Sequence, residues 1–312
     1  MIVKNKNKKG FSLVEISIVI LIIGLLVAGI SKATDMIFDA EVKAARSLTR
    51  GSKINRIQGL TLWLESTLSE SIVDGVRFDA TNIADWRDIN TQSVSKVFFK
   101  ATGTPKFLLA GFNNVPGIRF NATADVFLPY LNSASSTVAT YPSTQIFSAG
   151  AFASIFVVAS PVASSEVFNF CEYATSAVSC SAGKEVKVGF DSTGKVNFSF
   201  PSSAAATASI LSTNAVTGRQ AVIISAVKNA GGNRLFVDGA NAQTTAVANT
   251  LTAMPSFTGT FRIGPAGAAN ANFTVYEVLV FNTNLTDEDR YAVEDYLSKK
   301  YAIAVTKTTI TP

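Results

Sequence analysis

The most regular pattern in the chain is an apolar run near its start, from Phe11 to Ile30. Its twenty residues contain one charge, Glu15, and as a helix they would be about 30 Å long, which matches the hydrocarbon thickness of a bilayer. Lysines lie directly before the run and none lies inside it, which places the lysine-rich end in the cytoplasm. The pattern predicts one membrane-spanning helix over 11–30. A carboxylate at mid-membrane is unfavourable by roughly 2.5–3.5 kcal/mol, and by less near an end, so Glu15 is a candidate functional residue.

The helical pattern continues beyond the membrane span as an amphipathic segment over 31–57. Apolar positions recur at spacings of three and four residues, and charged residues form a stripe on roughly the opposite side. Within this stripe, Asp39 and Lys43 are spaced for a favourable i,i+4 pair. No proline interrupts residues 11–57, so we expect one long helix that ends near Gly51 or Gly59. The apolar positions are Ala33, Ile37, Ala40, Ala44 and Leu48, and the charged positions are Lys32, Asp35, Asp39, Lys43, Arg46 and Arg50.

From Leu60 onward the pattern changes to an alternation with a period of two, which is typical of strands. The sequence marks two hairpin turns, one at Asp238-Gly239 and one over 191–194. Many short strands without alternating helices predict an antiparallel β-sandwich within a head of residues 58–312. Surface loops are expected over 132–143 and 264–270. The expected strands are Leu60–Glu65, Lys96–Lys100, Lys106–Ala110, Gly117–Asn121, Ala153–Ser160, Glu166–Glu172, Glu185–Phe190, Lys195–Phe200, Ala221–Val227, Arg234–Val237, Thr260–Ile263 and Thr274–Phe281.

A second helix is predicted near the C-terminus. Thr286 is a good N-cap, the acidic residues 287–289 favour the first turn, and Lys299 and Lys300 favour the last turn. The predicted fold class is therefore α+β: a long N-terminal helix, then an antiparallel β-sandwich of the jelly-roll kind, then a short C-terminal helix. The residues expected to dock this last helix on the sandwich are Tyr291, Val293, Leu297 and Tyr301.

The composition narrows the functional classes. The formal net charge is +5, but four lysines lie within residues 1–10, and no basic stripe with interleaved aromatic residues follows. Nucleic-acid binding is therefore not indicated. The chain has no histidine, which excludes Ser-His-Asp and Cys-His catalysis and histidine-containing metal sites. The sequence predicts no cofactor and no metal site.

The chain has two cysteines, Cys171 and Cys180, separated by eight residues. The environment beyond the inner membrane is oxidising, so we expect a disulfide between them that closes a short loop. Such a closure contributes roughly 2–3 kcal/mol in the chain-entropy model. The alternative is a pair of free thiols buried in strands. The Cys-x-x-Cys spacing is missing, so a redox centre is not indicated.

The residues Lys8-Lys9-Gly10-Phe11-Ser12-Leu13-Val14-Glu15 and the apolar run after them resemble the class III signal of type IV prepilins. The resemblance implies cleavage between Gly10 and Phe11 by a prepilin peptidase, followed by N-methylation of Phe11. In that family, the glutamate at the position of Glu15 helps a subunit to dock by pairing with the N-terminal amine of a neighbour. A buried carboxylate requires such a partner, although the amine of its own chain, one helical turn away, competes for it. Many pilins carry a helix-breaking proline in this region, and this chain has none.

The same resemblance implies partners and location. The partners are the prepilin peptidase, the pilus assembly machinery and other pilin subunits, with no nucleic acid among them. The subunit is a single-pass protein of the bacterial inner membrane before assembly and part of an extracellular pilus afterwards. Residues 1–10 form the cleaved leader and residues 11–57 the pilin helix.

Simpler interpretations of the N-terminus are weaker. A secretory signal could use Val27-Ala28-Gly29 as its cleavage site, but Glu15 is unfavourable in such a core and the helical pattern continues past the site. A plain membrane anchor leaves Glu15 without a role. A lipoprotein signal is excluded because the first cysteine is Cys171.

Short motifs are spread in order along residues 60–301. They are Leu62-Trp63-Leu64-Glu65, Trp86-Arg87-Asp88, Val115–Asn121, Ser154–Val158, Asn233–Gly239, Arg262-Ile263-Gly264, and Glu277–Phe281 leading into Leu285–Glu288. In this order they resemble the laminin-G-like, or concanavalin A-like, jelly rolls of bacterial surface proteins. The resemblance implies two curved antiparallel sheets that often bind carbohydrate or protein, sometimes with calcium. The acidic residue usual after the first Trp-Leu is Glu65 here, which is a mild departure.

Concanavalin A-like folds include glycanases, which place two carboxylates on one strand so that alternate residues face the cleft. The sequence has no strand of the Glu-x-Asp-x-Glu kind, and helix capping explains the acidic run 287–289. We therefore do not expect an enzyme. Trp63 and Trp86 are expected in the core, with sugar stacking as the alternative. No Asp-x-Asp-x-Asp-Gly calcium loop occurs.

These patterns lead to a functional expectation. The chain is expected to be a structural subunit of a type IV pilus or a related filament, assembled through its N-terminal helix and displaying a β-sandwich head. Two alternatives remain. One is a minor pilin at the tip, whose head is a carbohydrate- or protein-binding adhesin. The other is a pseudopilin of a type II secretion system, which carries the same N-terminal signal.

Overall fold

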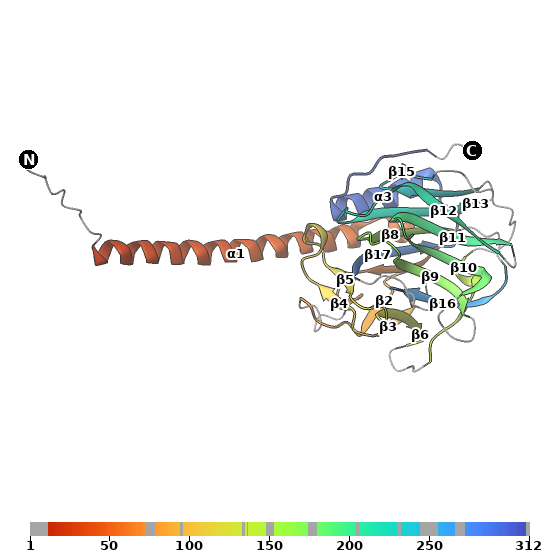
Figure 1. The fold of residues 1–312 in the computed structure, drawn as a ribbon, viewed down its shortest axis with the longest axis horizontal. Coiled ribbons are helices and arrows are strands. Elements are labelled where there is room, and N and C mark those ends of the chain that lie inside the picture. The colour runs from red at the N-terminus through yellow and green to blue at the C-terminus, as the bar shows by residue number, and fades with distance from the viewer. Residues whose placement is uncertain are drawn as a thin grey trace, which may run out of the picture.

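A computed structural model describes most of the chain and shows a long helix that projects from a β-rich head (Figure 1). The predicted processing residues Gly10 and Phe11 lie outside the described residues. The described ranges are 12–72, 79–93, 96–132, 135, 137–147, 153–173, 180–203, 206–229, 232–243, 255–265 and 272–309.

The N-terminal helix α1 runs without interruption from Leu13 to Gly51, across 39 residues. It begins with a capping box, in which the Ser12 side chain accepts from the first turn and the Glu15 side chain accepts from the Ser12 backbone. The backbone of Ser52 leaves the helical region, at φ −68° and ψ 151°, and this ends the helix. The end at Gly51 is one of the two expected from the sequence. A 3₁₀ turn, η1 (Ile54–Arg56), follows.

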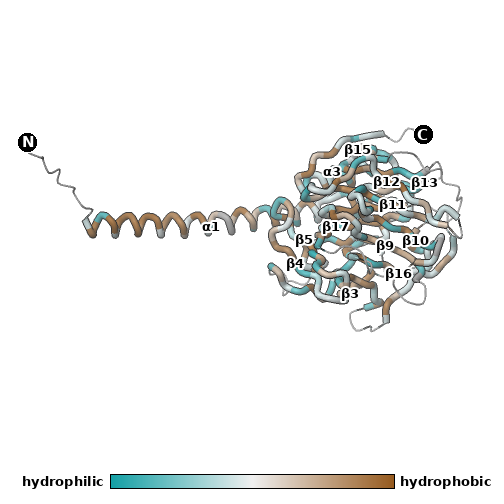
Figure 2. The backbone as a smooth tube through the Cα atoms, in the orientation of Figure 1, coloured by the Kyte–Doolittle hydropathy of each residue, from teal (hydrophilic) through white to brown (hydrophobic). Residues whose placement is uncertain are grey.

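Two parts of α1 differ in their surroundings. The large apolar side chains between Leu13 and Ile37 are each at least half exposed, and most of this part of the helix is hydrophobic (Figure 2). It is long and apolar enough to cross a membrane, and none of its apolar stretch is buried. Further along, Val42, Ala45 and Thr49 are buried against the head. The helix is therefore free along its first part and fixed along its last turns.

The head contains two sheets in which every described strand pair is antiparallel. The first sheet has the order β15-β14-β13-β8-β17-β5-β4, with β1 also paired to β17, and the second has the order β12-β11-β10-β9-β16-β6-β3-β2, with β7 paired to β16. The strands of the first sheet are β1 (Leu60–Glu65), β4 (Lys106–Leu108), β5 (Gly117–Phe120), β8 (Ala153–Ala159), β13 (Val222–Asn229), β14 (Gly232–Val237), β15 (Ala240–Asn241) and β17 (Phe273–Phe281). Those of the second are β2 (Asp85–Arg87), β3 (Phe98–Thr102), β6 (Val126–Tyr130), β7 (Tyr141–Pro142), β9 (Glu166–Tyr173), β10 (Cys180–Phe190), β11 (Lys195–Ser203), β12 (Ala206–Ala215) and β16 (Thr258–Ile263). The short helical segments between strands are η3 (Phe112–Asn114) and α2 (Ser143–Ile146).

The first sheet lies between two apolar cores. Alternate side chains of a strand point to opposite faces, so Ile155 and Val157 of β8 enter the core between the sheets. Phe156 and Val158 of the same strand enter a second core, under the C-terminal helix α3 (Asp287–Tyr301) and the end of α1. This double coverage explains why β8 and β17 are buried at every position and have no polar alternation.

The predicted fold class is confirmed, and most strands lie where the alternation places them. Asp238 and Gly239 both have positive φ, of 49° and 73°, as the predicted two-residue turn between β14 and β15 requires. Two longer strands were not predicted: β6, whose Pro129 argues against an inner strand, and β12, whose residues are mostly small and polar. The short β2, β7 and β15 were also missed, and β7 lies within the predicted loop 132–143. Of the predicted loop 264–270, residues 266–270 lie outside the described part of the chain.

Helix α3 begins as predicted, with the Thr286 hydroxyl accepting from the Asp289 backbone at 3.2 Å. Val293, Leu297 and Tyr301 are buried against the first sheet, as expected, whereas Tyr291 is half-buried. The chain leaves the helix at Ala302, which has a φ of 51°. The segment after it bonds to the turn before β15, through Thr306 N and Asp238 O at 2.8 Å. This contact covers the outer edge of the first sheet.

One buried carboxylate holds the connection between β2 and β3 against β1. Oδ1 of Asp88 accepts from the backbone N–H groups of Trp63 and Asn90, both at 2.9 Å. Asp88 is 2% exposed, and burial raises its pKa to about 6, despite these hydrogen bonds, which act in the opposite direction. Between the unfolded pKa and this value the native state binds more protons than the unfolded state. Stability from this group is therefore complete near pH 4 and is lost as the pH rises through 6.

We expect Asp88→Asn to remove this dependence, because its amide oxygen can still accept from Trp63 and Asn90. The free energy of unfolding of the variant, relative to wild type, should rise by roughly 2–3 kcal/mol between pH 4 and pH 7. Chemical denaturation of the full chain in detergent at several pH values measures this. Asp85→Asn, which changes a partly exposed carboxylate on β2, is the matched control. Its free energy of unfolding relative to wild type should not change with pH. If the free energy of unfolding of Asp88→Asn relative to wild type also did not change with pH, the raised pKa assigned to Asp88 would be wrong.

Candidate assembly helix and its junction with the head

Glu15, the candidate assembly residue, takes part in the cap of its own helix. Its Oε2 accepts from the backbone N–H of Ser12 at 2.7 Å, and its Oε1 accepts no bond from the described residues. The carboxylate therefore has a local role that the sequence analysis did not identify, although Ser-x-x-Glu is the sequence signature of a capping box. One oxygen remains for a positive partner.

The junction between α1 and the head is built around a buried ammonium group. Lys300 Nζ, on α3, lies 2.9 Å from Oε2 of Glu65 on β1 and 2.8 Å from Oε2 of Glu277 on β17. All three side chains are fully buried. Two carboxylates share one ammonium, so the group carries a net charge of −1 if all three are ionised. We call Glu65, Glu277, Tyr296, Lys300 and Tyr301 the Lys300 cluster.

Hydrogen bonds occupy the remaining oxygens of the two carboxylates. Glu277 accepts from Trp63 Nε1 at 2.7 Å, from Tyr296 Oη at 2.7 Å and from Tyr301 Oη at 2.9 Å. Glu65 accepts from the backbone and the hydroxyl of Thr67, at 2.8 and 2.6 Å, and from the backbone of Leu68. A buried charged group is stable only with such complete pairing.

The cluster reaches α1 through Tyr296, whose phenol oxygen lies 3.1 Å from the hydroxyl of Thr49. Two more contacts attach α1 to the head nearby. Arg46 Nε donates to the carbonyl of Thr67 at 2.8 Å, and Asn114 donates to Glu41 at 2.6 Å. The helix is therefore joined to β1, β17 and α3 as well as through the backbone.

The electrostatics of the cluster favour its charged form. Burial alone would raise the pKa of Glu65, but the Lys300 ammonium and the hydrogen bonds from Thr67 outweigh it and hold the pKa below its usual value. Burial would lower the pKa of Lys300, but Glu277 and Glu65 outweigh it and raise that pKa. Burial and the nearby carboxylates raise the pKa of Tyr296 well above its usual value, so this phenol stays a donor. The ion pair between Glu65 and Lys300 therefore persists across the neutral range.

A second buried network fixes α3 to the first sheet. Arg290 is fully buried and donates to both oxygens of Glu294, at 2.8 and 3.0 Å, and Glu294 also accepts from Ser225 of β13 at 2.8 Å. The Arg290 guanidinium lies 3.9 Å from the centre of the Phe236 ring. Helix α3 is thus held at both ends of its buried face.

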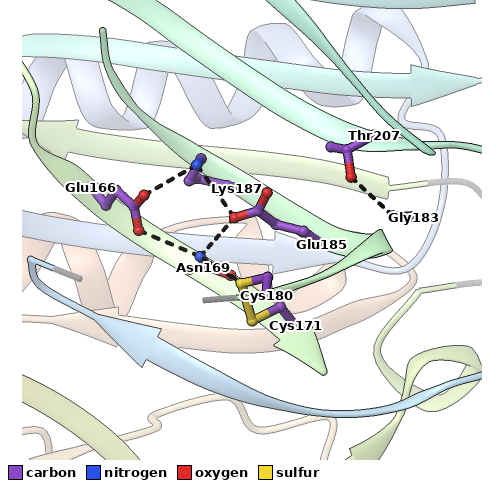
Figure 3. The surroundings of a disulfide bond; sticks show 8 residues. All are labelled: Glu166, Asn169, Cys171, Cys180, Gly183, Glu185, Lys187 and Thr207. Atoms are coloured by element: carbon purple, nitrogen blue, oxygen red, sulfur yellow. Dashed lines mark hydrogen bonds and ion pairs between the residues drawn. A yellow bond between two sulfur atoms is a disulfide. The ribbon is translucent and has the colours of Figure 1, made fainter. Parts of the chain in front are cut away.

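The disulfide lies in the second sheet, on the opposite side of the sandwich from α3. Cys171 of β9 and Cys180 of β10 are bonded, with their Cα atoms 5.7 Å apart, as the sequence analysis predicted. Beside it, Lys187 pairs with Glu166 at 3.1 Å and with Glu185 at 3.3 Å, and Asn169 donates to Glu185 at 3.1 Å (Figure 3). The disulfide therefore links the end of β9 to the start of β10, which follows it in the chain.

Both tryptophans belong to the interior. Trp63 is 1% exposed and Trp86 is fully buried, and Trp86 Nε1 donates to the carbonyl of Glu65 at 2.9 Å. They are core residues, as expected, and do not offer a face to a sugar. Among the described residues, no group of three or more His, Cys, Asp or Glu side chains could hold a metal ion.

These features define a class of protein: a β-sandwich head joined through a buried charged junction to a membrane-length N-terminal helix. The family model that matches the chain agrees with the helix. Residues 5–31 match the prokaryotic N-terminal methylation motif, which includes Gly10, Phe11 and Glu15. A comparison with curated proteins finds no match.

Solved structures resemble the head in fold. The binding domain of botulinum neurotoxin DC, solved with rat synaptotagmin II, is 10% identical with a TM-score of 0.53, over 78% of this chain and 52% of its own length. The ligand-binding domain of botulinum neurotoxin serotype D, solved with N-acetylneuraminic acid, is 10% identical with a TM-score of 0.50, over the same shares. A sialidase of Trypanosoma rangeli is 13% identical with a TM-score of 0.49, over 80% of this chain and 34% of its own. This chain spans a third to a half of these proteins, and the likeness is one of fold.

The Lys300 cluster generates a stability prediction. Lys300→Met leaves two buried carboxylates without their ammonium, so we expect a loss of about 3–5 kcal/mol at pH 7. The loss should shrink toward pH 4, where the carboxylates can protonate. Unfolding of the full chain in detergent measures both. Lys299→Met is the control, because Lys299 is exposed and, within the described part of the chain, pairs only with Asp295 one turn away. This substitution should cost less than about 0.5 kcal/mol. Equally small losses of stability for Lys300→Met and Lys299→Met would show that the Lys300 cluster does not stabilise the fold.

Proposed function

We propose that this chain is a type IV pilin-type subunit. It is inserted in the inner membrane through α1, cleaved between Gly10 and Phe11 by a prepilin peptidase, methylated at Phe11, and assembled with other subunits by the pilus machinery. The proposal rests on one observation: the methylation motif, the apolar helix and the folded head follow one another directly along the chain. The methylation motif of residues 5–31 leads directly into an exposed apolar helix, and that helix is firmly attached to a folded head.

The head is proposed to be a displayed domain without catalytic activity. Among the described residues, Glu65 and Glu277 are two carboxylates that lie together, and both are fully buried and already bonded to Lys300. Neither has an open position for a substrate. Their chemistry is explained by the attachment of α3 and α1.

Within the pilin class, a structural subunit of the filament is the leading candidate. The second candidate is a minor subunit at the tip, with the head as an adhesin of the laminin-G-like kind. The neurotoxin domains that resemble the head in fold were solved with a protein and with a sialic acid, which supports this candidate through the fold alone. A type II secretion pseudopilin is the third.

The location of a labelled head on cells distinguishes these three candidates. A fluorescent label on the head of the full chain should decorate whole filaments for a structural subunit, their ends for a tip adhesin, and the periplasm for a pseudopilin. Label that stays in the inner membrane, with no filament purified from the same cells, would contradict all three.

Processing is predicted to depend on Gly10. The mature protein should begin with N-methylated Phe11, and Gly10→Leu should leave an uncleaved, unassembled chain in the membrane, because the peptidase site has no room for a bulky residue. N-terminal sequencing and mass spectrometry of the membrane fraction measure this. Gly29→Ala is the control, since an added Cβ meets nothing within 4 Å, and it should be processed normally. A mature N-terminus near Ile30 would instead favour a secretory signal.

Glu15 is predicted to act in assembly through its charge. Glu15→Gln keeps a capping-box side chain and loses the charge, Glu15→Ala loses both, and Ser12→Ala weakens the cap and keeps the charge. Both Glu15 variants should be processed and stay in the membrane but fail to enter filaments, since the amine of the neighbour is left unpaired. Ser12→Ala should assemble. Sheared filaments and membrane fractions are quantified for each variant. Wild-type incorporation of Glu15→Gln would show that the charge has no assembly role.

A further inference from the structure

Two charged side chains of α1 have no partner in the described structure. Asp39 and Lys43 are both exposed, and neither forms an ion pair or hydrogen bond with a described residue. The i,i+4 pair expected between them from the sequence is therefore absent. The head covers Val42, Ala45 and Thr49 of the same helix and leaves these two positions open.

The spacing of these residues repeats that of the processing and assembly residues. Asp39 follows Phe11 by 28 residues, and Lys43 follows Glu15 by the same 28. The span is four heptads, or about 42 Å along a helix. Because α1 is unbroken from Leu13 to Gly51, the spacing between Glu15 and Lys43 is fixed by the helix itself.

The same heptad count defines one seam along the helix. One row consists of positions 11, 18, 25, 32 and 39, and the other of positions 15, 22, 29, 36 and 43. Each row repeats every seven residues and the rows are four residues apart, as the d and a positions of a coiled coil are. The residues between the charged ends are mainly apolar and exposed: Ile18, Ile22, Leu25 and Met36. Lys32 interrupts the row just beyond the membrane span, where its stem can pack while its ammonium reaches water.

We propose that a second copy of this chain packs in parallel along this seam, shifted by four residues, or about 6 Å. The inference rests on the proposed function, since it takes Phe11 as the mature N-terminus. This single shift places the amine of one copy at Glu15 of the next and, at the other end, Asp39 of one copy at Lys43 of the next. Asp39 and Lys43 thus form a second intersubunit ion pair outside the membrane.

The geometry requires the two helices to wrap around each other. In a straight α-helix, positions four heptads apart drift by about 80°, and a left-handed wrap removes this drift. Both charged pairs then face the same neighbour. A depression of about 230 Å³ lies at this flank, between α1 and the connection from β4 to β5, and leaves room for the side chains of the neighbour. It is lined by Phe38, Asp39, Val42, Lys43, Arg46, Leu109 and Pro116.

Charge reversal tests the pairing between chains. Asp39→Lys alone and Lys43→Asp alone place like charges together and should each give a roughly tenfold loss of filaments. Cells that express both variants together should regain filaments, because each subunit then meets the opposite charge on its neighbour. If Asp39 and Lys43 instead pair within one chain, expressing both variants together should not restore filaments, because each variant chain still carries two like charges. Two failing variants without rescue, or variants that assemble like wild type, would overturn the proposal.

A crosslink gives the register directly. When Asp39→Cys and Lys43→Cys subunits are expressed together, mild oxidation of the filaments should produce a dimer that neither variant forms alone, and Ala33→Cys with Lys43→Cys should form none. Absence of the 39–43 dimer in filaments that assemble would overturn the four-residue shift and leave the proposed function intact. If wild type forms no filament and keeps residues 1–10, the proposed function fails and this inference fails with it.

Discussion

The ammonium of Lys300 is the interaction on which the arrangement of the head depends. It lies in the interior between Glu65 and Glu277, and it brings together β1, β17 and α3, with Thr49 of α1 one hydrogen bond further on. A charge in such surroundings interacts strongly and tolerates no displacement, because a carboxylate left unpaired would be far less stable there than in water. We infer that the cluster selects one register of helix against sheet, whereas the apolar contacts around it would accept several.

This junction also explains the asymmetry of the sandwich. With α3 and the end of α1 on its outer face, the first sheet is interior on both sides, and its strands β8 and β17 are buried at every position. The second sheet has one buried face, and its other face carries ion pairs such as that of Lys187 with Glu166. A partner that approaches the head therefore meets the polar face of the second sheet or the connecting loops.

The sequence predicted the parts of the structure that depend on local pattern. The long helix with one of its two expected ends, the Thr286 cap, the Asp238-Gly239 turn and the disulfide follow from periodicity, capping and spacing. The Lys300 cluster could not be found in this way. The predicted docking face of Val293, Leu297 and Tyr301 already places Lys300 on the buried side of α3. However, Glu65 is 235 residues away in the chain, and no local pattern indicates it or Glu277 as a partner. Strand β6 was missed because Pro129 interrupts residues that otherwise favour a strand, and β12 was missed because its residues are mostly small and polar.

The attachment of α1 has a mechanical consequence. In the proposed filament, tension passes from one helix to the next, and the head must not unravel from the point where the helix enters it. Here the load leaves α1 along several parallel routes: the backbone into β1, the Thr49 hydroxyl into α3 through Tyr296, and the Arg46 guanidinium into the carbonyl of Thr67. Because β1 is paired along its length with β17, a strand buried on both faces, force that enters there is spread over many bonds that must yield together.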